Sequence, residues 1–251
     1  MGYPILEFDE DRDAIIQPHA LLPRDRLPVR GVACFFQEVM EQVCASKGAN
    51  ELHRLTAEHG TQPIYELEFS GERLAVFHPG VGGPLAAGWL EEVIAMGVRK
   101  LIACGGAGTL IPELTLGHVI VPNAAVRDEG TSYHYLPPGR EVEVAPHVLD
   151  CVEAVLRERE VPYVVGKTWT TDAIYRETRT RATRRRDEGC VAVEMEAASM
   201  LGVAKFRGVE LGYLLYAGDS LAGEEWDHRH WQKHSGRKEL FWLAAAAAVR
   251  L

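Results

Sequence analysis

Two carboxylates, Glu194 and Glu196, lie one residue apart inside an apolar run that continues with helical spacing. This pattern is typical of a strand that leads directly into a helix. A carboxylate in apolar surroundings is costly unless it binds something, so the pair calls for partners such as sugar hydroxyls, amides or cations. The simpler interpretation is a helix start, where the helix dipole favours acidic side chains. These two residues alone leave both interpretations open.

Three glycine-containing stretches accompany the pair, and each of them follows or closes an apolar run: HPGVGGP at 78–84, LIACGGAG at 101–108 and AGDS at 217–220. Backbone N–H groups at Gly105 and Gly106 can cradle an anion. Asp219 is either an acid that acts on a ligand or a simple turn or helix-cap aspartate. The glycine spacing of 80–84 differs from that of a dinucleotide-binding loop, so the sequence does not predict that fold.

In this order the stretches resemble the nucleoside phosphorylase family, of the kind that includes uridine phosphorylase and hexameric purine nucleoside phosphorylase. The resemblance runs from about Tyr65 to Leu243, and its most specific piece is Glu-Met-Glu-Ala at 194–197. It implies cleavage of the N-glycosidic bond of a nucleoside, first of all by phosphorolysis to base and ribose 1-phosphate. It implies no cofactor, phosphate as co-substrate, and a homodimer or a hexamer built as a trimer of dimers.

The resemblance also implies roles for the matching residues. Glu194, Met195 and Glu196 would grip the ribose hydroxyls. His134 would approach the primary hydroxyl of the sugar, in its own or a neighbouring subunit's site, although a lone loop histidine can equally be plain surface imidazole. Asp219 lies where purine-cleaving members keep the acid that protonates the base. The remaining implied contacts are a base site at Thr171, Asp172 and Tyr175, and a phosphate or nucleophile pocket at Gly82, Gly83, Gly105, Gly106 and Arg127.

The sequence departs from the family where phosphate should bind. Three arginines of the family are missing, and their places are taken by Gln17-Pro18-His19, by the vicinity of His59-Gly60, and by Ala103. The usual hydroxyl of the glycine loop is replaced by Gly106. Phosphorolysis therefore requires compensation by another cation, for which the candidates are Arg24, Arg26, Arg30 and Arg127.

Two alternatives follow from this loss. Without a compensating cation, water is the nucleophile and the protein is a nucleosidase. An alternative of another class is a non-catalytic relative that binds or stores nucleosides. The base also stays open, because residues 176–179 do not reproduce the Gln-x-Arg with which uridine phosphorylases read uracil.

Composition excludes several other functions. The chain has 27 Lys and Arg against 36 Asp and Glu, a formal net charge of −9, which argues against general binding to nucleic acid or to an anionic membrane surface. Arginines crowd residues 176–186, where a solvated helix face is the expected explanation. Five scattered cysteines without CxxC spacing predict neither a metal site nor a disulfide framework. No signal-peptide core or membrane-spanning run is present, so a cytoplasmic protein is expected.

Periodicity predicts an α/β fold, with one domain over 1–251 and an irregular N-terminal segment over 1–30. A hairpin is expected from 64–69 and 74–77, and a strand, helix, strand unit continues through 85–96 to 101–104. A first short strand is possible at 14–16. Further strands are expected at 119–122, 163–171, 191–194 and 209–216, and helices at 146–160 and 239–249. Alternation of strands and helices predicts a three-layer α/β/α domain with a mixed, partly closed central sheet, whose ligands collect at the carboxyl ends of strands.

Overall fold

The strands of the computed structural model form one mixed sheet, described here for residues 2–58, 60–230 and 236–251. The strands are β1 (Arg30–Cys34), β2 (Asn50–Ala57), β3 (Gly60–Phe69), β4 (Glu72–Phe77), β5 (Lys100–Thr109), β6 (Val119–Asp128), β7 (Glu141–Glu143), β8 (Tyr163–Thr171), β9 (Cys190–Glu194) and β10 (Glu210–Ser220). The α-helices are α1 (Pro18–Leu21), α2 (Gln37–Lys47), α3 (Gly83–Ala95), α4 (Pro146–Glu158), α5 (Arg179–Asp187), α6 (Ala197–Arg207) and α7 (Gly236–Arg250). Single 3-10 turns are η1 (Pro4–Leu6), η2 (Thr131–His134) and η3 (Ile174–Arg176).

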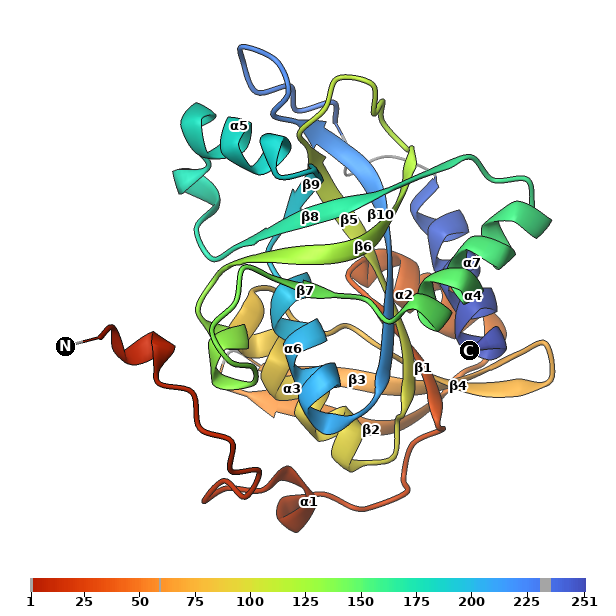
Figure 1. Cartoon of the computed structure of the whole chain (residues 1–251). Coiled ribbons are helices and arrows are strands. Elements are labelled where there is room, and N and C mark those ends of the chain that lie inside the picture. The colour runs from red at the N-terminus through yellow and green to blue at the C-terminus, as the bar shows by residue number, and fades with distance from the viewer. Residues whose placement is uncertain (1, 59, 231–235) are drawn as a thin grey trace.

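The sheet closes on itself over half of its width. Its strand order is β10-β6-β8-β9-β5-β1-β4-β3-β2, and β10 also pairs with β5, so that β5, β9, β8, β6 and β10 form a ring (Figure 1). Parallel pairs such as β1–β5 and β6–β8 lie beside antiparallel pairs such as β5–β9 and β6–β10. The predicted mixed, partly closed sheet is therefore confirmed.

Helices cover both faces of the sheet. Along β1, Val32 and Cys34 face the core cluster that contains α2, α4 and α7, whereas Ala33 faces the cluster that contains α3 and α6. Successive side chains of a strand point to opposite faces, so this strand is buried on both sides. Figure 1 shows α4 and α7 on one side of the strands and α3 and α6 together on the other. This arrangement confirms the three-layer prediction.

Local predictions hold where an apolar pattern is strong. The hairpin is present as β3 and β4, with Ile64 opposite Phe77. β2 was not foreseen, because half of its residues are exposed and polar and the strand lacks the alternation that marks a strand in the sequence. The expected strand at 14–16 is wrong: Ile15 and Ile16 are exposed and no strand precedes Arg30 among the described residues. An isolated apolar triplet without a partner strand has no ladder to join.

Helix α5 also differs from expectation. Two of its five arginines, Arg179 and Arg184, are exposed, as a solvated face requires, but Arg185 is buried. A buried guanidinium needs acceptors, so this side of α5 must pack against polar partners. In the part of the chain that the structure describes, no helix combines the length and apolar character that a bilayer crossing requires.

Candidate active site

A cavity of about 630 Å³ opens where strands of the ring end, within the size range of small-molecule sites. β1 leaves β5 after the Cys34–Cys104 pair, and β9 joins β5 only at the Gly108–Val193 pair. Between these two pairings β5 borders the cavity with Gly105 and Gly106. The cavity is lined by Phe35, Phe36, Val81, residues 105–108, Ile174, Tyr175, Glu177, Arg179, Ala182, residues 193–196, Tyr213, Leu215, Gly218, Asp219, Leu221, Gly223, Glu225, Trp226 and Arg237.

Glu194, the last residue of β9, is held by the protein itself. Its Oε1 accepts a hydrogen bond from Thr170 Oγ1 at 2.6 Å, and its Oε2 accepts from the backbone N of Glu196 at 2.7 Å and of Ala197 at 2.6 Å. Burial raises the pKa of this carboxyl, and the donated hydrogen bonds oppose that shift. The helix-start interpretation therefore describes Glu194, which caps α6 and fixes the turn that carries Glu196.

Glu196 is the carboxylate with more freedom. It borders the cavity, and its Oε1 accepts a hydrogen bond from the backbone N of Gly82 at 2.6 Å. Burial, and after it the charge of Glu194, raises the pKa of Glu196 to about 8. A carboxylate with unused lone pairs at a cavity wall is suited to accept hydrogen bonds from sugar hydroxyls.

Gly82 and Gly83 support Glu196 and do not border the cavity themselves. Gly82 has φ 87°, in the left-handed region that favours glycine, and this conformation presents its N–H to the carboxylate. A Cβ on Gly83 would lie 2.4 Å from Ser199 Oγ, so only glycine allows the start of α3 to approach α6 so closely. The structure thus places both glycines behind the residues that line the cavity, and their role in a nucleophile pocket stays a prediction.

The glycines of β5 pack against aromatic rings. A Cβ on Gly105 would lie 3.0 Å from the Phe35 ring, and one on Gly106 would lie 3.1 Å from the Tyr216 ring. Replacement by larger residues would push these rings and narrow the cavity. The glycine pair thus leaves space beside the strand, and its role in holding an anion stays a prediction.

Acidic groups gather at another part of the wall. Asp219, near the end of β10, accepts a hydrogen bond from Trp226 Nε1 at 2.6 Å through its Oδ2. Glu177 follows η3, is half-buried, and has a pKa raised to about 7 by burial and, secondly, by Asp219. Sequence reasoning missed Glu177 and Trp226. Glu177 was hidden in the arginine-rich segment, and Trp226 lies in a polar loop without a pattern.

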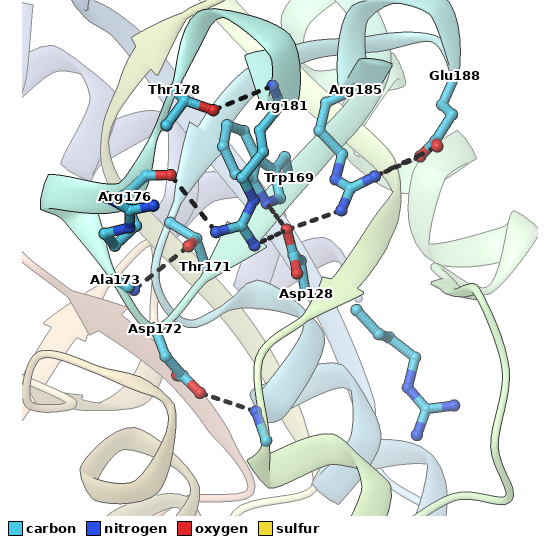
Figure 2. Close-up of polar contacts among 12 residues, drawn as sticks. Asp128, Trp169, Thr171, Asp172, Ala173, Arg176, Thr178, Arg181, Arg185 and Glu188 are labelled. Atoms are coloured by element: carbon cyan, nitrogen blue, oxygen red, sulfur yellow. Dashed lines mark hydrogen bonds and ion pairs between the residues drawn. The ribbon is translucent and has the colours of Figure 1, made fainter. Parts of the chain in front are cut away.

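A partly buried charge cluster holds the segment that carries Glu177. Figure 2 shows Arg181 and Arg185 converging on Asp128, whose Oδ2 accepts from both guanidiniums at 2.6 and 2.7 Å and from Trp169 Nε1 at 2.9 Å. Arg185 also pairs with Glu188. These contacts fasten α5 to β6 and β8 and so fix the position of η3.

Thr171 and Asp172, the predicted base contacts, stabilise the same turn. Thr171 Oγ1 accepts from the backbone N of Ala173 at 3.3 Å, and Asp172 Oδ2 accepts from that of Gly130 at 2.8 Å (Figure 2). Neither residue borders the cavity, whereas Tyr175, three residues after Asp172, does. Of the three expected base contacts, the structure brings Tyr175 alone to the site.

Comparison with known proteins agrees with this geometry. A family model described as the phosphorylase superfamily matches residues 29–247. The chain belongs to this superfamily. Guanosine phosphorylase of Halorubrum lacusprofundi is 28% identical over 174 residues, which cover 68% of this chain and 71% of that protein. The chain is therefore an enzyme of a superfamily that acts on nucleosides.

Two solved structures show the same fold at low identity. Purine nucleoside phosphorylase from Toxoplasma gondii superposes with a TM-score of 0.76 at 22% identity, covering 96% of this chain and 98% of that one. AMP nucleosidase from Bacteroides thetaiotaomicron superposes with a TM-score of 0.71 at 21% identity, covering 89% and 88%. At this identity the likeness concerns the fold alone.

The arginines that were expected to compensate at the phosphorylase anion site lie elsewhere. Arg127 is buried beneath the 131–138 loop, where Nε donates to Ser132 Oγ at 2.8 Å and Nη1 to Pro137 O at 2.8 Å. Arg26 donates to Leu52 O, Arg30 pairs with Glu72, and neither of these arginines nor Arg24 borders the cavity. His59 lies outside the described residues. Arg127 faces into its own loop because the Ser132 hydroxyl and the backbone carbonyls of Leu136 and Pro137 satisfy its donors.

Arg237, at the start of α7, borders the cavity instead. Its guanidinium lies 4.1 Å from the centre of the Phe36 ring and is paired with Glu38. Of the described residues that line the cavity, the positively charged ones are Arg179 and Arg237. Nothing in the sequence near Arg237 predicted that its side chain would line the cavity. The packing of α7 on β1 and β5 brings Arg237 to the site.

His134 is separated from the cavity in one copy of the chain. It lies in η2 and borders a second cavity of about 480 Å³, between the N-terminal segment and the helices α3 and α6. The predicted contact of His134 with the primary hydroxyl of a sugar stays a prediction. Since His134 does not line the main cavity of its own chain, that contact would have to be made in the site of a neighbouring copy.

Proposed function

We propose that the enzyme cleaves the N-glycosidic bond of a nucleoside by phosphorolysis. The proposal is carried by one observation: a single cavity holds the Glu196 carboxyl, the Asp219 carboxyl and the Arg237 guanidinium, beside the open glycine edge of β5. This reaction needs an acceptor that binds the sugar hydroxyls, an acid that protonates the leaving base and a cation that binds an anionic nucleophile. The name of the guanosine phosphorylase relative supports the same reaction.

In this mechanism Glu196 accepts hydrogen bonds from the ribose hydroxyls, and Glu194 fixes the turn behind it. The bond between C1′ and the base nitrogen breaks, and its electron pair leaves with the base. A phosphate oxygen forms the new bond to C1′ on the opposite face. The Asp219 carboxyl supplies a proton to the departing base, and Trp226 Nε1 holds its other oxygen.

Phosphate binding is assigned to Arg237 and the backbone of Gly105 and Gly106. The aromatic face of Phe36 orients the guanidinium. An arginine can bind a phosphate through two parallel N–H groups, which gives both orientation and affinity. Glu38, which pairs with Arg237, would have to share it with the ligand.

Hydrolysis is the second candidate, and the balance of charge favours it. Two arginines line the described cavity against five acids: Glu177, Glu194, Glu196, Asp219 and Glu225. Like-charge repulsion weakens anion binding wherever these acids are ionised. With water as nucleophile the products are free base and ribose. AMP nucleosidase, which shares the fold, is named for the cleavage of a nucleotide.

One experiment separates the two reactions. Guanosine, inosine, adenosine and uridine are each incubated with the enzyme, with and without phosphate, and the sugar product is identified as ribose 1-phosphate or ribose. Phosphorolysis predicts product only with phosphate, and Arg237→Ala should raise the KM for phosphate roughly tenfold or more. Arg26→Ala, which lies outside the cavity, is the control and should leave this KM unchanged. Free ribose at saturating phosphate would establish the nucleosidase.

A further inference from the structure

His78 follows β4 directly, and its imidazole ring connects two loop segments beside the cavity. Nδ1 accepts a hydrogen bond from the backbone N of Gly80 at 3.0 Å, and the ring also hydrogen-bonds to the backbone of Phe35. Because the N–H of Phe35 is already donated to Cys104 O, the carbonyl of Phe35 is the acceptor and Nε2 of His78 is the donor. One half-buried ring thus uses both of its nitrogens.

This pair of contacts requires the neutral form of His78. A neutral imidazole has one donor and one acceptor nitrogen, whereas a protonated ring has two donors and would place an N–H against the N–H of Gly80. Burial, the largest effect, lowers the pKa of His78, although the contact with Phe35 and the charge of Glu38 on α2 oppose this shift. At neutral pH the fold therefore favours the neutral ring, with Nδ1 as the acceptor.

Both partners of His78 belong to segments that shape the site and lie outside the regular elements. Phe35 comes after the last residue of β1, lines the cavity and packs against Gly105. Gly80 lies between β4 and α3, in a loop with left-handed φ angles of 83° at Gly80 and 87° at Gly82. The N–H of Gly80 is therefore fixed by the His78 ring and not by a strand ladder.

The loop that His78 supports carries a donor to Glu196. The backbone N of Gly82, two residues after Gly80, donates to Glu196 Oε1 at 2.6 Å. Burial raises the pKa of Glu196, and this hydrogen bond opposes the shift. A loop that lost its contact at Gly80 would let the N–H of Gly82 move away from the carboxyl. The position and the ionisation of Glu196 therefore depend on His78, which does not itself line the cavity.

We propose that His78 is a positioning residue for nucleoside cleavage: its ring ties the end of β1 to the glycine loop and so holds the N–H of Gly82 against Glu196. This inference rests on the proposed function, in which Glu196 binds the ribose hydroxyls. A carboxylate that is held by a fixed donor is aligned before the sugar arrives and loses less conformational freedom on binding it. Loss of the His78 contacts should therefore raise the KM for the nucleoside.

Substitutions of His78 can remove its two contacts separately. The Oδ1 of an asparagine reaches the place of Nδ1, so His78→Asn keeps the acceptor for Gly80 N, whereas the amide nitrogen in His78→Gln reaches the place of Nε2 and keeps only the donor to Phe35. His78→Leu removes both contacts at similar side-chain volume. His118→Leu is the matched control, because Nδ1 of His118 also accepts from a loop N–H, that of Thr115 at 3.2 Å, but lies outside the cavity.

The direct measurement is the pKa of Glu196, followed by carbon NMR of isotope-labelled glutamate carboxyl groups and assigned with Glu196→Gln. In His78→Leu and His78→Gln this pKa should rise by about half a pH unit or more, because the hydrogen bond from Gly82 is weakened, and in His78→Asn it should stay at the wild-type value. The titratable groups beside Glu196 are Glu194 on β9 and Tyr213 on β10, and they are the same in every variant. An unchanged pKa of Glu196 in His78→Leu and His78→Gln overturns the inference.

Kinetics test the link to catalysis at pH 9, where Glu196 is ionised. The KM for guanosine should rise roughly tenfold in His78→Leu and stay within about threefold of the wild type in His78→Asn. Adding His78→Leu to Glu196→Gln should change this KM little further, because the two residues act on the same contact. Effects that multiply in the double variant would mean that His78 acts on the fold alone, and would reject the positioning role. His118→Leu should change neither the KM nor the pKa of Glu196.

The two readouts separate this inference from the proposed function. If the wild type cleaves no nucleoside, the proposed function fails, and the titration of Glu196 alone decides whether His78 positions its carboxyl. If His78→Leu does not fold, the comparison of His78→Gln with His78→Asn takes its place in both measurements.

Discussion

Replacing Glu196 by glutamine should stabilise the protein at high pH and impair catalysis. Burial and Glu194 raise the pKa of Glu196 from its ordinary 4.5 to about 8 in the folded chain. A raised carboxyl pKa means that the native state holds a proton that the unfolded state has released. The contribution of protonated Glu196 to the free energy of unfolding is fully present below pH 4.5 and is lost as the pH rises through 8.

The size of the effect follows from the same values. Each pKa unit is worth about 1.4 kcal/mol, so the rise from 4.5 to about 8 corresponds to at most about 5 kcal/mol. Glu194, whose pKa is also raised by burial, shares part of this cost. Glutamine can still accept the hydrogen bond from Gly82 N without becoming charged. At pH 9 we therefore expect Glu196→Gln to have the higher Tm.

Activity should change in the opposite direction. Above pH 8, where Glu196 is ionised, a charge-assisted hydrogen bond to a ribose hydroxyl contributes about 1.5–3 kcal/mol, so its loss should lower kcat/KM there roughly tenfold to a hundredfold. Thermal unfolding between pH 5 and pH 9 and steady-state kinetics with guanosine measure the two effects. Glu92→Gln is a matched control, because burial also raises the pKa of Glu92, which lies outside the main cavity. Unchanged kcat/KM together with a wild-type pH profile of Tm would refute the reasoning.

Two further changes probe the acid and the anchoring cluster. Asp219→Asn keeps an oxygen that can accept from Trp226 Nε1, but it cannot donate a carboxyl proton. The kcat for purine nucleosides in steady-state assays should therefore fall roughly tenfold or more. Unchanged turnover would show that Asp219 is not the acid. Asp128→Ala leaves Arg181, buried Arg185 and Trp169 without their shared acceptor, and urea unfolding should show a loss of about 3 kcal/mol or more. A loss below about 1 kcal/mol would mean that water replaces the carboxylate.

Much of the fold and the centre of the site could be predicted from local patterns. Period-two alternation marked the hairpin of β3 and β4, and an apolar run that changes to helical spacing marked the turn from β9 to α6. The residues of that turn, Glu194 to Glu196, lie in the cavity together with Gly105, Gly106 and Asp219. The hairpin and the turn depend on residues that are neighbours in the chain, so the sequence alone determined them, whereas the shared site was implied by the resemblance to the family.

Tertiary structure decided which of the charged side chains can contact a ligand in the cavity. The two glutamates look alike in the sequence, yet Glu194 is committed to the α6 cap and Glu196 faces the cavity. Arg127 points into its own loop, whereas Arg237 arrives from the far end of the chain and Glu177 from an arginine-rich helix start. Each outcome depends on closure of the ring by β5 and β10 and on how α5 and α7 pack against it. Such contacts join residues distant in the sequence, and no local pattern specifies them.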